Sequence, residues 1–510
     1  MKADPVWTAA CARRVDDLSI KTFHIPQSSL MERAGAAVAA VARKSGTSFL
    51  VLAGRGNNGG DALVAARLLS ADPTLTVTVV KTGDGPVEVP HAPRFDCIID
   101  GIFGLGFRGQ IDPESPEGRA LLAAARIKAR DGAAVVAVDL PSGMTCDDPG
   151  QTGAPLPADE TVTFGALKAV HAISPARDLC GHVHCVDIGF SDEAVAQALE
   201  DEKPVYGVIR SRDLLADNPW ARLPAAAHKY DRGHVLVAGG SPGKTGAPVL
   251  SALASLRAGA GWATLAIPDA IMTQANIPPD LTSESLFARG RGKSGIDPRR
   301  LETFVTSRKV RSIVIGPGTM ENPLGAKSLG FLCEFSREGF VVVDAGALQG
   351  IVDLMTKQRL EFKSGHAVFT PHPGEWTRMS MIRGIRGIRW PAPMGAENVL
   401  AVERACADLG VHVVYKHSTP VLCGPAPYHV DGNSRVRALV FNEGSNAMGR
   451  AGTGDVLAGC IAAHGAIGCE AAQAVMRGLS VVASAARLAA GKVGFHAVLP
   501  TDILGLIGKA

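Results

Sequence analysis

The feature that most constrains the fold is a repeated alternation of short apolar runs, glycine-containing or acidic loops, and helix-like stretches. In the first half, residues 49–53 run into the loop 54–61 (GRGNNGGD), and a helical stretch follows. In the second half, the apolar run 340–343 is followed by Asp344, and the apolar run 313–315 is followed by a glycine-proline turn. Strands that alternate with helices form parallel sheets, whose ligands bind beyond the carboxyl ends of the strands. The sequence therefore predicts α/β architecture with functional residues at those ends.

Length and composition indicate two or more ordinary globular domains. A chain of 510 residues is too long for one core, and its contents of 46% hydrophobic and 20% charged residues are typical of globular proteins. The net charge of +3 gives no electrostatic reason to expect nucleic acid or an anionic membrane as a partner. No apolar stretch reaches the ~18–20 residues of a membrane span, and the first residues lack the apolar core of a secretory signal. We therefore expect a cytoplasmic protein.

One cysteine- and histidine-rich run invites a metal interpretation. Residues 180–185 (CGHVHC) contain two cysteines and two histidines, which are possible zinc ligands. The spacing differs from standard zinc motifs, and no second pair follows. Reduced, buried thiols in a cytoplasmic protein are the simpler interpretation.

The loop 54–61 lies between a predicted strand and a predicted helix, the context of a nucleotide site. It is neither a GxGxxG motif nor a P-loop, because it has no Lys-Ser/Thr pair. Asn57, Asn58 and Asp61 instead supply amide and carboxylate oxygens, which suit a cation or the ribose and phosphates of a ligand. The alternative is a tight turn with asparagine in left-handed conformations.

Two further apolar runs of the first half end in aspartate. Asp100 ends the run 97–100, and Asp139 ends the run 134–139 shortly before Ser142. A single such aspartate is often a turn residue. Since parallel strands bring their carboxyl ends to one edge of a sheet, we expect these side chains to converge with the loop 54–61.

Residues 452–455 (GTGD) open a run of small apolar residues that is typical of the first turn of a buried helix. A glycine turn at a helix N-terminus directs free N–H groups and the positive end of the helix dipole at one point, which suits a phosphate. Asp455 could there act as a base towards a substrate hydroxyl. The alternative is an aspartate N-cap on a glycine-rich helix start.

The motifs GRGNNGGD, DGIFGLG (100–106) and VDLPSG (138–143), with MERAG before them and TFGALKAVH after them, resemble the NAD(P)H-hydrate epimerase domain. The resemblance covers residues 8–200 and implies a Rossmann-like three-layer sandwich that interconverts the R and S hydrates of NADH and NADPH at C6 of the nicotinamide ring. It implies a K⁺ ion held by Asn58, Asp100 and Ser142, and a proton-transfer role for Asp139. Lys168 is a further candidate for this site, and the alternative is a surface or phosphate-steering lysine. The implied substrate-binding residues are Asn57, Asn58, Gly59, Gly60, Asp61, Gly104, Leu105, Gly106, Phe107, Arg108, Gly109, Gln110 and Asp139.

A second set of motifs resembles the ADP/ATP-dependent NAD(P)H-hydrate dehydratase, a ribokinase-like α/β family. These are GGSPGKTGAP (239–248), IGPGT (315–319), TPHPGE (370–375) and AGTGDVLAG (451–459). The first is no Walker motif, because Lys244 comes one position too early. The resemblance implies that Asp455 deprotonates the hydrate, that the hydroxyl is phosphorylated and leaves as phosphate, and that Mg²⁺ accompanies ADP or ATP. The implied hydrate site is Ala247, Gly318, His372 and Asp455, and the implied nucleotide site is Lys416, His417, Ser418, Thr419, Pro420 and Gly454.

The sequence departs from the second family at two positions. Gly346 stands where the family often has a second aspartate after Asp344, and His417 stands where glycine is usual after Lys416. A histidine narrows the nucleotide loop, which bears on the choice between ADP and ATP. His372 has a second interpretation as a turn cap.

The organisation expected from these patterns is an epimerase domain over residues 1–210 and a dehydratase domain over residues 211–510. Residues 191–227 are polar and interrupted by prolines, and we interpret them as a helix followed by a connector. The expected function is repair of hydrated NADH and NADPH (NADHX and NADPHX) by a homo-oligomer. The alternative is a ribokinase-like small-molecule kinase whose N-terminal half is a non-catalytic ligand-binding module.

Overall fold

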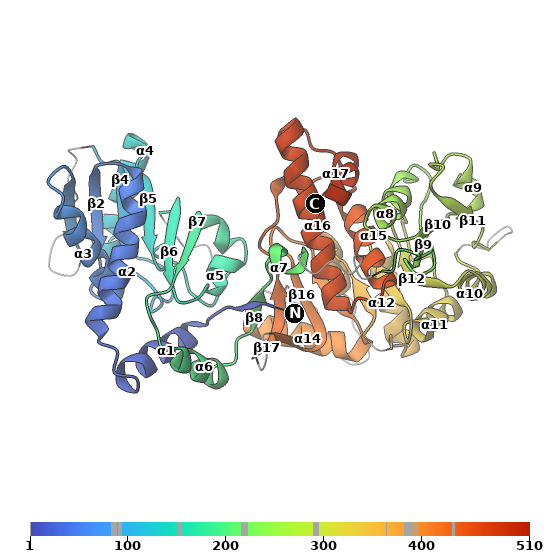
Figure 1. Cartoon of the computed structure of the whole chain (residues 1–510), viewed down its shortest axis with the longest axis horizontal. Coiled ribbons are helices and arrows are strands. Elements are labelled where there is room, and N and C mark those ends of the chain that lie inside the picture. Colours follow the sequence, from blue (N-terminus) through green and yellow to red (C-terminus); the bar gives the residue numbers. More distant parts are fainter. Residues whose placement is uncertain are drawn as a thin grey trace.

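The computed structural model describes residues 2–509, except for residues 83–88, 90–93, 151–155, 216–222, 289–294, 364, 382–391, 393–394 and 431–433. The described helices and strands form two units that follow one another along the longest axis of the molecule (Figure 1). Each unit has its own sheet, and neighbouring strands in both sheets are mostly parallel. The predicted fold class is confirmed.

The first sheet has six parallel strands in the order β3-β2-β4-β5-β6-β7. The chain passes from β2 outward to the edge strand β3 and returns to pair β4 with the other side of β2, so the strand order reverses between β2 and β4. Such a switch point leaves a crevice beyond the strand ends. The strands are β2 (Ser48–Ala53), β3 (Thr76–Lys81), β4 (Cys97–Gly101), β5 (Ala134–Val138), β6 (Glu160–Phe164) and β7 (His182–Val186).

Helices cover both faces of this sheet and make the predicted three layers. Apolar residues of α2 (Gln27–Ala42) and α3 (Asn57–Ser70) pack on one face. Those of α4 (Pro116–Asp131) pack on the other face. The remaining helices of the unit are α1 (Ala9–Lys21), α5 (Ala169–Ala172) and α6 (Asp192–Asp201), with 3₁₀ turns at Arg43–Ser45 and Ala176–Leu179.

The second sheet has eleven strands in the order β1-β8-β17-β16-β15-β14-β13-β12-β9-β10-β11. Its strand order reverses between β9 and β12, which makes a second switch point. The strands are β1 (Asp4–Pro5), β8 (Tyr206–Val208), β9 (His234–Ala238), β10 (Trp262–Ala266), β11 (Thr282–Glu284), β12 (Val310–Ile315), β13 (Phe340–Val343), β14 (Ala367–Phe369), β15 (His412–Tyr415), β16 (Val421–Val430) and β17 (Ser434–Val440).

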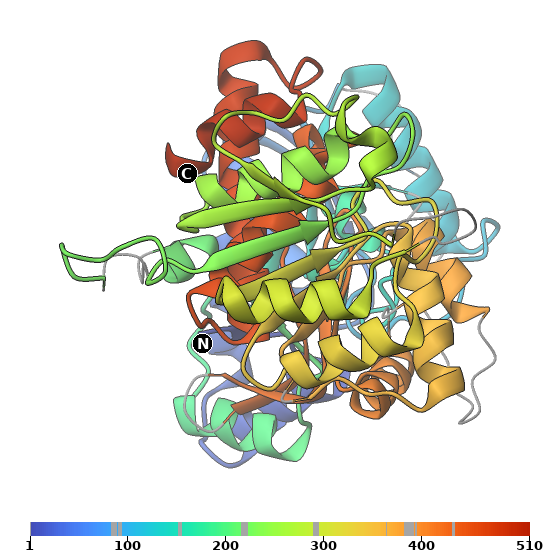
Figure 2. The same cartoon turned by 90° about the vertical axis from the view of Figure 1, so that its right-hand side faces the viewer.

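Figure 2 shows helices on both faces of this sheet. One face carries α8 (Gly246–Arg257), α15 (Thr453–Ala466), α16 (Ala471–Val493) and α17 (Pro500–Leu506). The other carries α10 (Pro298–Ser307), α11 (Ala326–Phe335), α12 (Ala347–Gln358), α13 (Pro373–Ser380) and α14 (Ala396–Leu409). The shorter helices are α7 (Ser211–Leu215) and α9 (Asp269–Met272), with 3₁₀ turns at Asn446–Met448 and Ile507–Lys509.

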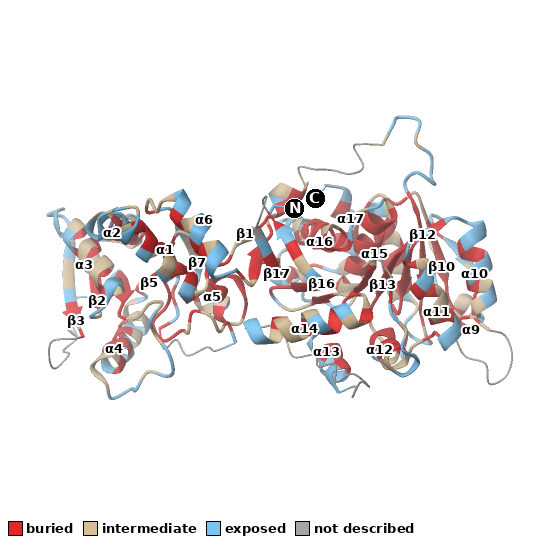
Figure 3. Cartoon of the chain, turned by 90° about the horizontal axis from the view of Figure 1, so that it is seen from below, coloured by how far each residue is buried: buried red, intermediate tan, exposed pale blue. Residues whose placement is uncertain are grey.

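Helix α15 lies in the centre of this core (Figure 3). Every residue of α15 is buried except Gly454 and Asp455 in its first turn. Its small side chains allow close contact with α8 and α16 on either side. The expected helix after GTGD is therefore confirmed, with the aspartate at its accessible end.

The expected connector over residues 191–227 is only partly right. Residues 192–201 form α6 as predicted, but β8 follows and pairs with β17 of the second sheet. Strand β1, close to the N-terminus, then pairs with β8. Strand β8 has three residues and β1 has two. Such short strands suffice because each pairs with the edge of an existing sheet. Their patterns are too short to detect in the sequence.

The two units also share apolar packing. Val6, Leu167, Ala169 and Ile173 lie in the same buried cluster as the strands and helices on one face of the second sheet. In Figures 1 and 3, α5 lies on the side of the first unit that faces the second. The segment around α5 is therefore held against the second unit by buried contacts.

No helix in the described part of the chain is long and apolar enough to cross a membrane. None of the ten cysteines is joined in a disulfide.

Candidate functional sites

A cavity of about 930 Å³ lies at the switch point of the first sheet. Its wall is built from the loops that follow β2 and β4, from the end of β5 and from α1. The predicted residues on its wall are Asn57, Asn58, Asp61, Gly104, Leu105, Gly106, Phe107, Arg108, Asp139 and Lys168.

The loops after β2 and β4 are joined by side-chain and backbone contacts. Asn58 Nδ2 donates to the carbonyl oxygen of Phe103 at 2.9 Å. Gly59 is buried, and a Cβ atom there would lie 1.9 Å from the carbonyl oxygen of Gly54, so only glycine permits this approach. The predicted residues Gly59, Gly60, Gly109 and Gln110 do not line the cavity. Gly59 therefore allows the close backbone approach within the loop and does not itself face the cavity.

Asp100 and Ser142 lie together in the interior, and the cavity wall does not include them. The Asp100 carboxylate accepts the Ser142 hydroxyl at 2.6 Å and the Ser142 N–H at 2.9 Å. Burial raises the pKa of Asp100, and the Ser142 hydrogen bonds only partly oppose the rise. No cationic side chain in the described structure pairs with this carboxylate. A buried carboxyl group without a cation is costly unless it is protonated or an ion accompanies it.

Asp139 takes part in a buried ion pair. Lys168 Nζ lies 2.8 Å from Asp139 Oδ1, and the Thr163 hydroxyl donates to the same oxygen at 2.8 Å. Burial acts to raise the pKa of Asp139, but Lys168, together with His171 and the Thr163 hydrogen bond, outweighs burial, and the pKa lies below its ordinary value. Asp139 also has a positive φ of 61°, a conformation that a non-glycine residue seldom adopts without a local constraint. Of the two interpretations of Lys168, the surface lysine is wrong, because its side chain is 2% exposed.

Two other carboxyl groups face the same cavity and titrate differently. Burial raises the pKa of Asp61 to about 8, and the charges of Asp139 and Asp16 add to the rise. Burial raises the pKa of Asp16 to about 6, although Lys168 opposes the rise. Asp16 lies on α1, and no motif in the sequence singled it out. Carboxyl groups whose pKa values are pushed apart are candidates for acid and base roles.

The second cavity has a volume of about 870 Å³ and contains the accessible end of α15. Gly452 precedes the helix with a positive φ of 97°, which glycine adopts freely. Burial raises the pKa of Asp455 to about 7, Asp344 adds to the rise, and Lys416 opposes it. The Thr453 N–H donates to the carbonyl oxygen of Arg450 at 3.1 Å. The Thr453 N–H is therefore already paired within the protein and is not one of the free N–H groups expected at this helix end.

Lys416 is held beside α15 by two carboxylates. Its Nζ lies 2.6 Å from Asp344 Oδ1 and 3.9 Å from Glu375 Oε2. Burial disfavours the ammonium, but Asp344 and Glu375 outweigh burial and raise the pKa of Lys416. A Cβ atom at Gly454 would lie 3.3 Å from Lys416 Nζ, so the glycine turn and the lysine are adjacent. A cation, a helix N-terminus and a carboxyl group with a pKa near 7 thus share one cavity.

Comparison with known proteins places this architecture in a family. Residues 235–509 match the model of the NAD(P)H-hydrate dehydratase family, and residues 27–89 and 82–170 match that of the YjeF-related protein N-terminus. A bifunctional NAD(P)H-hydrate repair enzyme of Archaeoglobus fulgidus is 31% identical over 88% of this chain and 86% of its own. The chain belongs to the family of bifunctional NAD(P)H-hydrate repair enzymes.

Relatives with the same description cover nearly the whole chain. The repair enzyme of Thermofilum pendens is 29% identical over 97% of this chain and 94% of its own. That of Escherichia coli is 27% identical over 100% of this chain and 95% of its own. Both units of this chain therefore have counterparts in the family.

The remaining residues predicted for the second half divide into two groups. The cavity wall includes His372, Gly454, Asp455, Lys416, His417, Ser418, Thr419 and Pro420. It does not include Ala247 or Gly318, which lie against each other at the switch point between β9 and β12. His372 also caps α13, because its Nδ1 accepts the Gly374 N–H at 3.0 Å. The cap interpretation and a place on the cavity wall both hold for this residue.

The two departures from the family have a structural account. A Cβ atom at Gly346 would lie 2.2 Å from the carbonyl oxygen of Thr319, so this chain has no room there for an aspartate. The ring of His417 stacks on Tyr415, with ring centroids 5.8 Å apart and an interplanar angle of 4°. The histidine thus lies against the protein within the loop 416–420.

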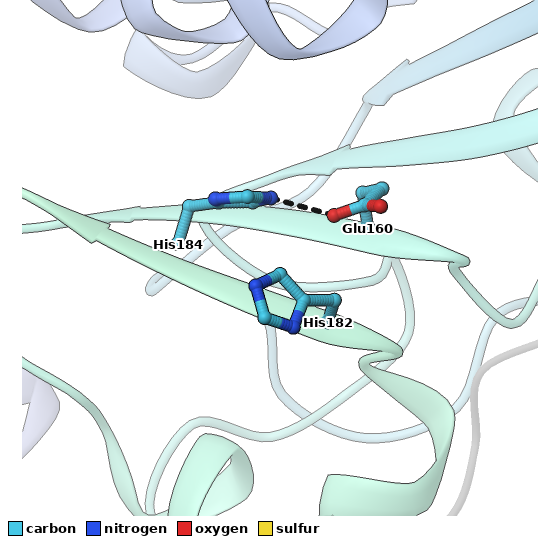
Figure 4. A group of neighbouring side chains, drawn as sticks. All are labelled: Glu160, His182 and His184. Atoms are coloured by element: carbon cyan, nitrogen blue, oxygen red, sulfur yellow. Dashed lines mark hydrogen bonds and ion pairs between the residues drawn. The ribbon is translucent and has the colours of Figure 1, made fainter. Parts of the chain in front are cut away.

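The run 180–185 does not form a cysteine site. Cys180 is buried and Cys185 is exposed. His182 and His184 instead lie beside Glu160 on β6, and His184 Nε2 is 2.6 Å from a Glu160 oxygen (Figure 4). The three side chains could hold a metal ion together, but Glu160 and His182 begin their strands, His184 lies in the middle of β7, and none of the three lines the cavity. A pairing across β6 and β7 could not be found from spacing within one segment.

Proposed function

We propose that this chain repairs hydrated NADH and NADPH in two steps, epimerisation in the first cavity and nucleotide-dependent dehydration in the second. The observation that carries the proposal is the arrangement at the accessible end of α15, where Asp455 and Gly454 adjoin Lys416. Such an end suits the transfer of a phosphoryl group to a hydroxyl. The family to which the chain belongs supports both steps.

Epimerisation inverts C6, which bears both the hydroxyl group and the ring nitrogen. One balanced route has a base take the hydroxyl proton while the C6–N bond breaks and the nitrogen gains a proton; closure on the opposite face reverses each transfer. Asp61, with a pKa raised to about 8, can exchange protons near neutral pH. Asp139, paired with Lys168, stays ionised and holds the ammonium in place. A direct proton-transfer role for Asp139 stays a prediction.

A K⁺ ion fits the residues below the first cavity. Asp100 and Ser142 supply hard oxygen donors, the carboxylate is buried without a cationic partner among the described residues, and Asn58 lies in the adjoining loop. These three residues would hold the ion. Its chemistry would be to offset the buried charge and fix the loops after β2 and β4.

In the second cavity, Asp455 would take the proton of the C6 hydroxyl as that oxygen attacks the terminal phosphoryl group of ADP or ATP. Breaking the phosphoanhydride bond yields AMP or ADP and a phosphorylated hydrate. Phosphate then leaves C6 with the bonding electrons while C5 loses a proton, which restores the dihydronicotinamide. Lys416 lies beside the helix end and would neutralise charge on the transferred group.

The nucleotide would lie along the loop 416–420, which lines the same cavity. Mg²⁺ fits this wall, because two carboxylates, those of Asp344 and Glu375, contact a single lysine, which leaves one negative charge uncompensated. These two carboxylates would hold the ion, whose chemistry is to shield the phosphates. We further propose the division into functional domains at residues 1–210 and 211–510, a cytoplasmic location and a homo-oligomeric assembly.

The test is to incubate the purified full-length protein with each hydrate epimer, with and without ADP or ATP. We expect interconversion of the epimers without nucleotide, and recovery of reduced-nicotinamide absorbance only when nucleotide is added. Accumulation of a stable phosphorylated product would instead support the small-molecule kinase. Failure to interconvert the epimers would support a non-catalytic N-terminal module.

A further inference from the structure

The wall of the second cavity is not made by the second unit alone. Ser174, Arg177 and Asp178 of the first unit line it together with the loop 416–420. They follow α5 and include the 3₁₀ turn Ala176–Leu179. Residues almost 240 positions apart in the sequence thus meet at one cavity.

The loop 174–178 is firmly attached to the nucleotide loop. The Ser174 N–H donates to Thr419 Oγ1 at 2.8 Å, and both residues are buried. The Ser174 hydroxyl donates to Asp178 Oδ1 at 2.8 Å, which ties the two ends of the loop together. Ala172 and Ile173, just before the loop, are buried in the apolar cluster of the second unit. The loop therefore has a defined position at the cavity.

The charges on the cavity wall leave a role for Arg177. Three of the residues that line the wall, Arg177, Lys416 and Arg450, carry a permanent positive charge. Lys416 already contacts the carboxylates of Asp344 and Glu375. Arg177 Nε is buried and makes no hydrogen bond to any described residue. A guanidinium nitrogen held out of water without a partner is unfavourable until an acceptor arrives.

We propose that Arg177 of the first unit binds the phosphates of the ADP or ATP used by the second unit, so that the nucleotide site is complete only when both units are joined. The inference rests on the proposed dehydration, which supplies the nucleotide. Guanidinium groups suit this task because their planar donor fork matches phosphate oxygens. Arg177 is then a nucleotide-binding residue, with no part in the proton transfer of Asp455.

The test compares Arg177→Ala with Arg126→Ala in the full-length protein. Arg126 is an exposed residue of α4 and does not line either cavity, so its removal changes the net charge equally. Affinity for ADP and ATP with Mg²⁺ is measured by titration calorimetry without hydrate. Loss of a charge-assisted hydrogen bond should weaken binding by about 10- to 100-fold in Arg177→Ala. Arg177→Lys should recover part of the loss.

Kinetics and thermal unfolding separate this role from a structural one. In Arg177→Ala, the KM for nucleotide should rise by a similar factor, while the epimerisation rate and the KM for hydrate stay at the Arg126→Ala values. Equal nucleotide affinity in the two variants would overturn the proposal, as would a parallel loss of epimerisation and thermal stability. If Arg126→Ala binds nucleotide but does not dehydrate the hydrate, the proposed function fails and the assignment of Arg177 stands. If neither binds nucleotide, both fail.

Discussion

At the scale of single residues, the two cavities contain aspartates whose pKa values differ widely. Asp139 is kept ionised by Lys168, whereas burial keeps Asp455 close to half-protonation and Asp61 mostly protonated at neutral pH. The sequence identified all three aspartates, because each follows an apolar run or opens a helix. It could not rank them, since a pKa depends on neighbours brought together by folding.

The ion pair of Asp139 changes how its function is best tested. Asp139→Ala would leave the Lys168 ammonium buried and unpaired, which costs about 3–5 kcal/mol. Asp139→Asn also removes the negative charge, but it keeps the shape and an oxygen that can accept from Thr163 and Lys168, so it should destabilise the domain less than Asp139→Ala. We expect epimerisation to fall by about 10²-fold or more, measured by chromatographic separation of the epimers. Asp192→Asn, at an exposed position on α6, is the control, and an unchanged rate in Asp139→Asn would remove Asp139 from the reaction.

Asp455 predicts a pH dependence for dehydration. A general base must be deprotonated, so with a pKa of about 7 the value of log kcat/KM should rise with unit slope below pH 7 and level off above it. Asp455→Asn should lose about 10²- to 10⁴-fold in rate and the pH dependence with it. Initial rates of absorbance recovery between pH 6 and 9 provide the measurement. A wild-type profile that is flat over this range would contradict the assignment of Asp455 as base.

At the scale of elements, apolar runs ending in aspartate or glycine were a sound guide. The runs at 49–53, 97–100 and 340–343 are strands with every residue buried, apart from small differences in their ends. The hairpin of β16 and β17 escaped detection. Its first strand is interrupted by Gly424 and Pro425, and its register shifts between Cys423 and Tyr428, which breaks the pattern of a regular strand.

Gly346 predicts a packing effect at the turn between β13 and α12. In Gly346→Ala, the added Cβ atom would meet the Thr319 carbonyl oxygen at 2.2 Å, so the turn has to shift. We expect a loss of about 1–3 kcal/mol in the free energy of unfolding, measured by denaturant titration. Gly330→Ala on α11 is the matched control, because nothing lies within 4 Å of a Cβ atom there. Equal midpoints for the two variants would mean that the turn relaxes without cost.

At the scale of the whole molecule, the two sheets were predictable and their connection was not. Each sheet follows from local alternation of strands and helices. The pairing of β8 with β17 and of β1 with β8, and the contact of Ser174 with Thr419, join segments about 200 residues or more apart. No local pattern carries information about such contacts, so Arg177 went unnoticed in the sequence.

The shared sheet predicts that the second unit is incomplete by itself. A fragment of residues 223–510 lacks β1 and β8, which leaves β17 as an unpaired edge. Exposed edges promote association with other chains. We expect this fragment to form heterogeneous assemblies by light scattering under conditions in which the full chain gives one species. Supplying residues 1–215 in trans should restore a single species; a fragment that is uniform and equally stable without them would show β8 to be dispensable.

Helix α15 has a broader consequence, because the proposed base Asp455 and the buried body behind it belong to one helix. The residues behind Asp455 touch the sheet and the two helices beside it, so a substitution that shifts the helix body would also shift the carboxylate. A shift of about 1 Å at a reacting atom can cost 10²-fold in rate. We therefore expect substitutions in α15 that are selected only for higher thermal stability to change the turnover rate as well. Engineering a more stable variant of the second unit then requires that stability and activity be measured together.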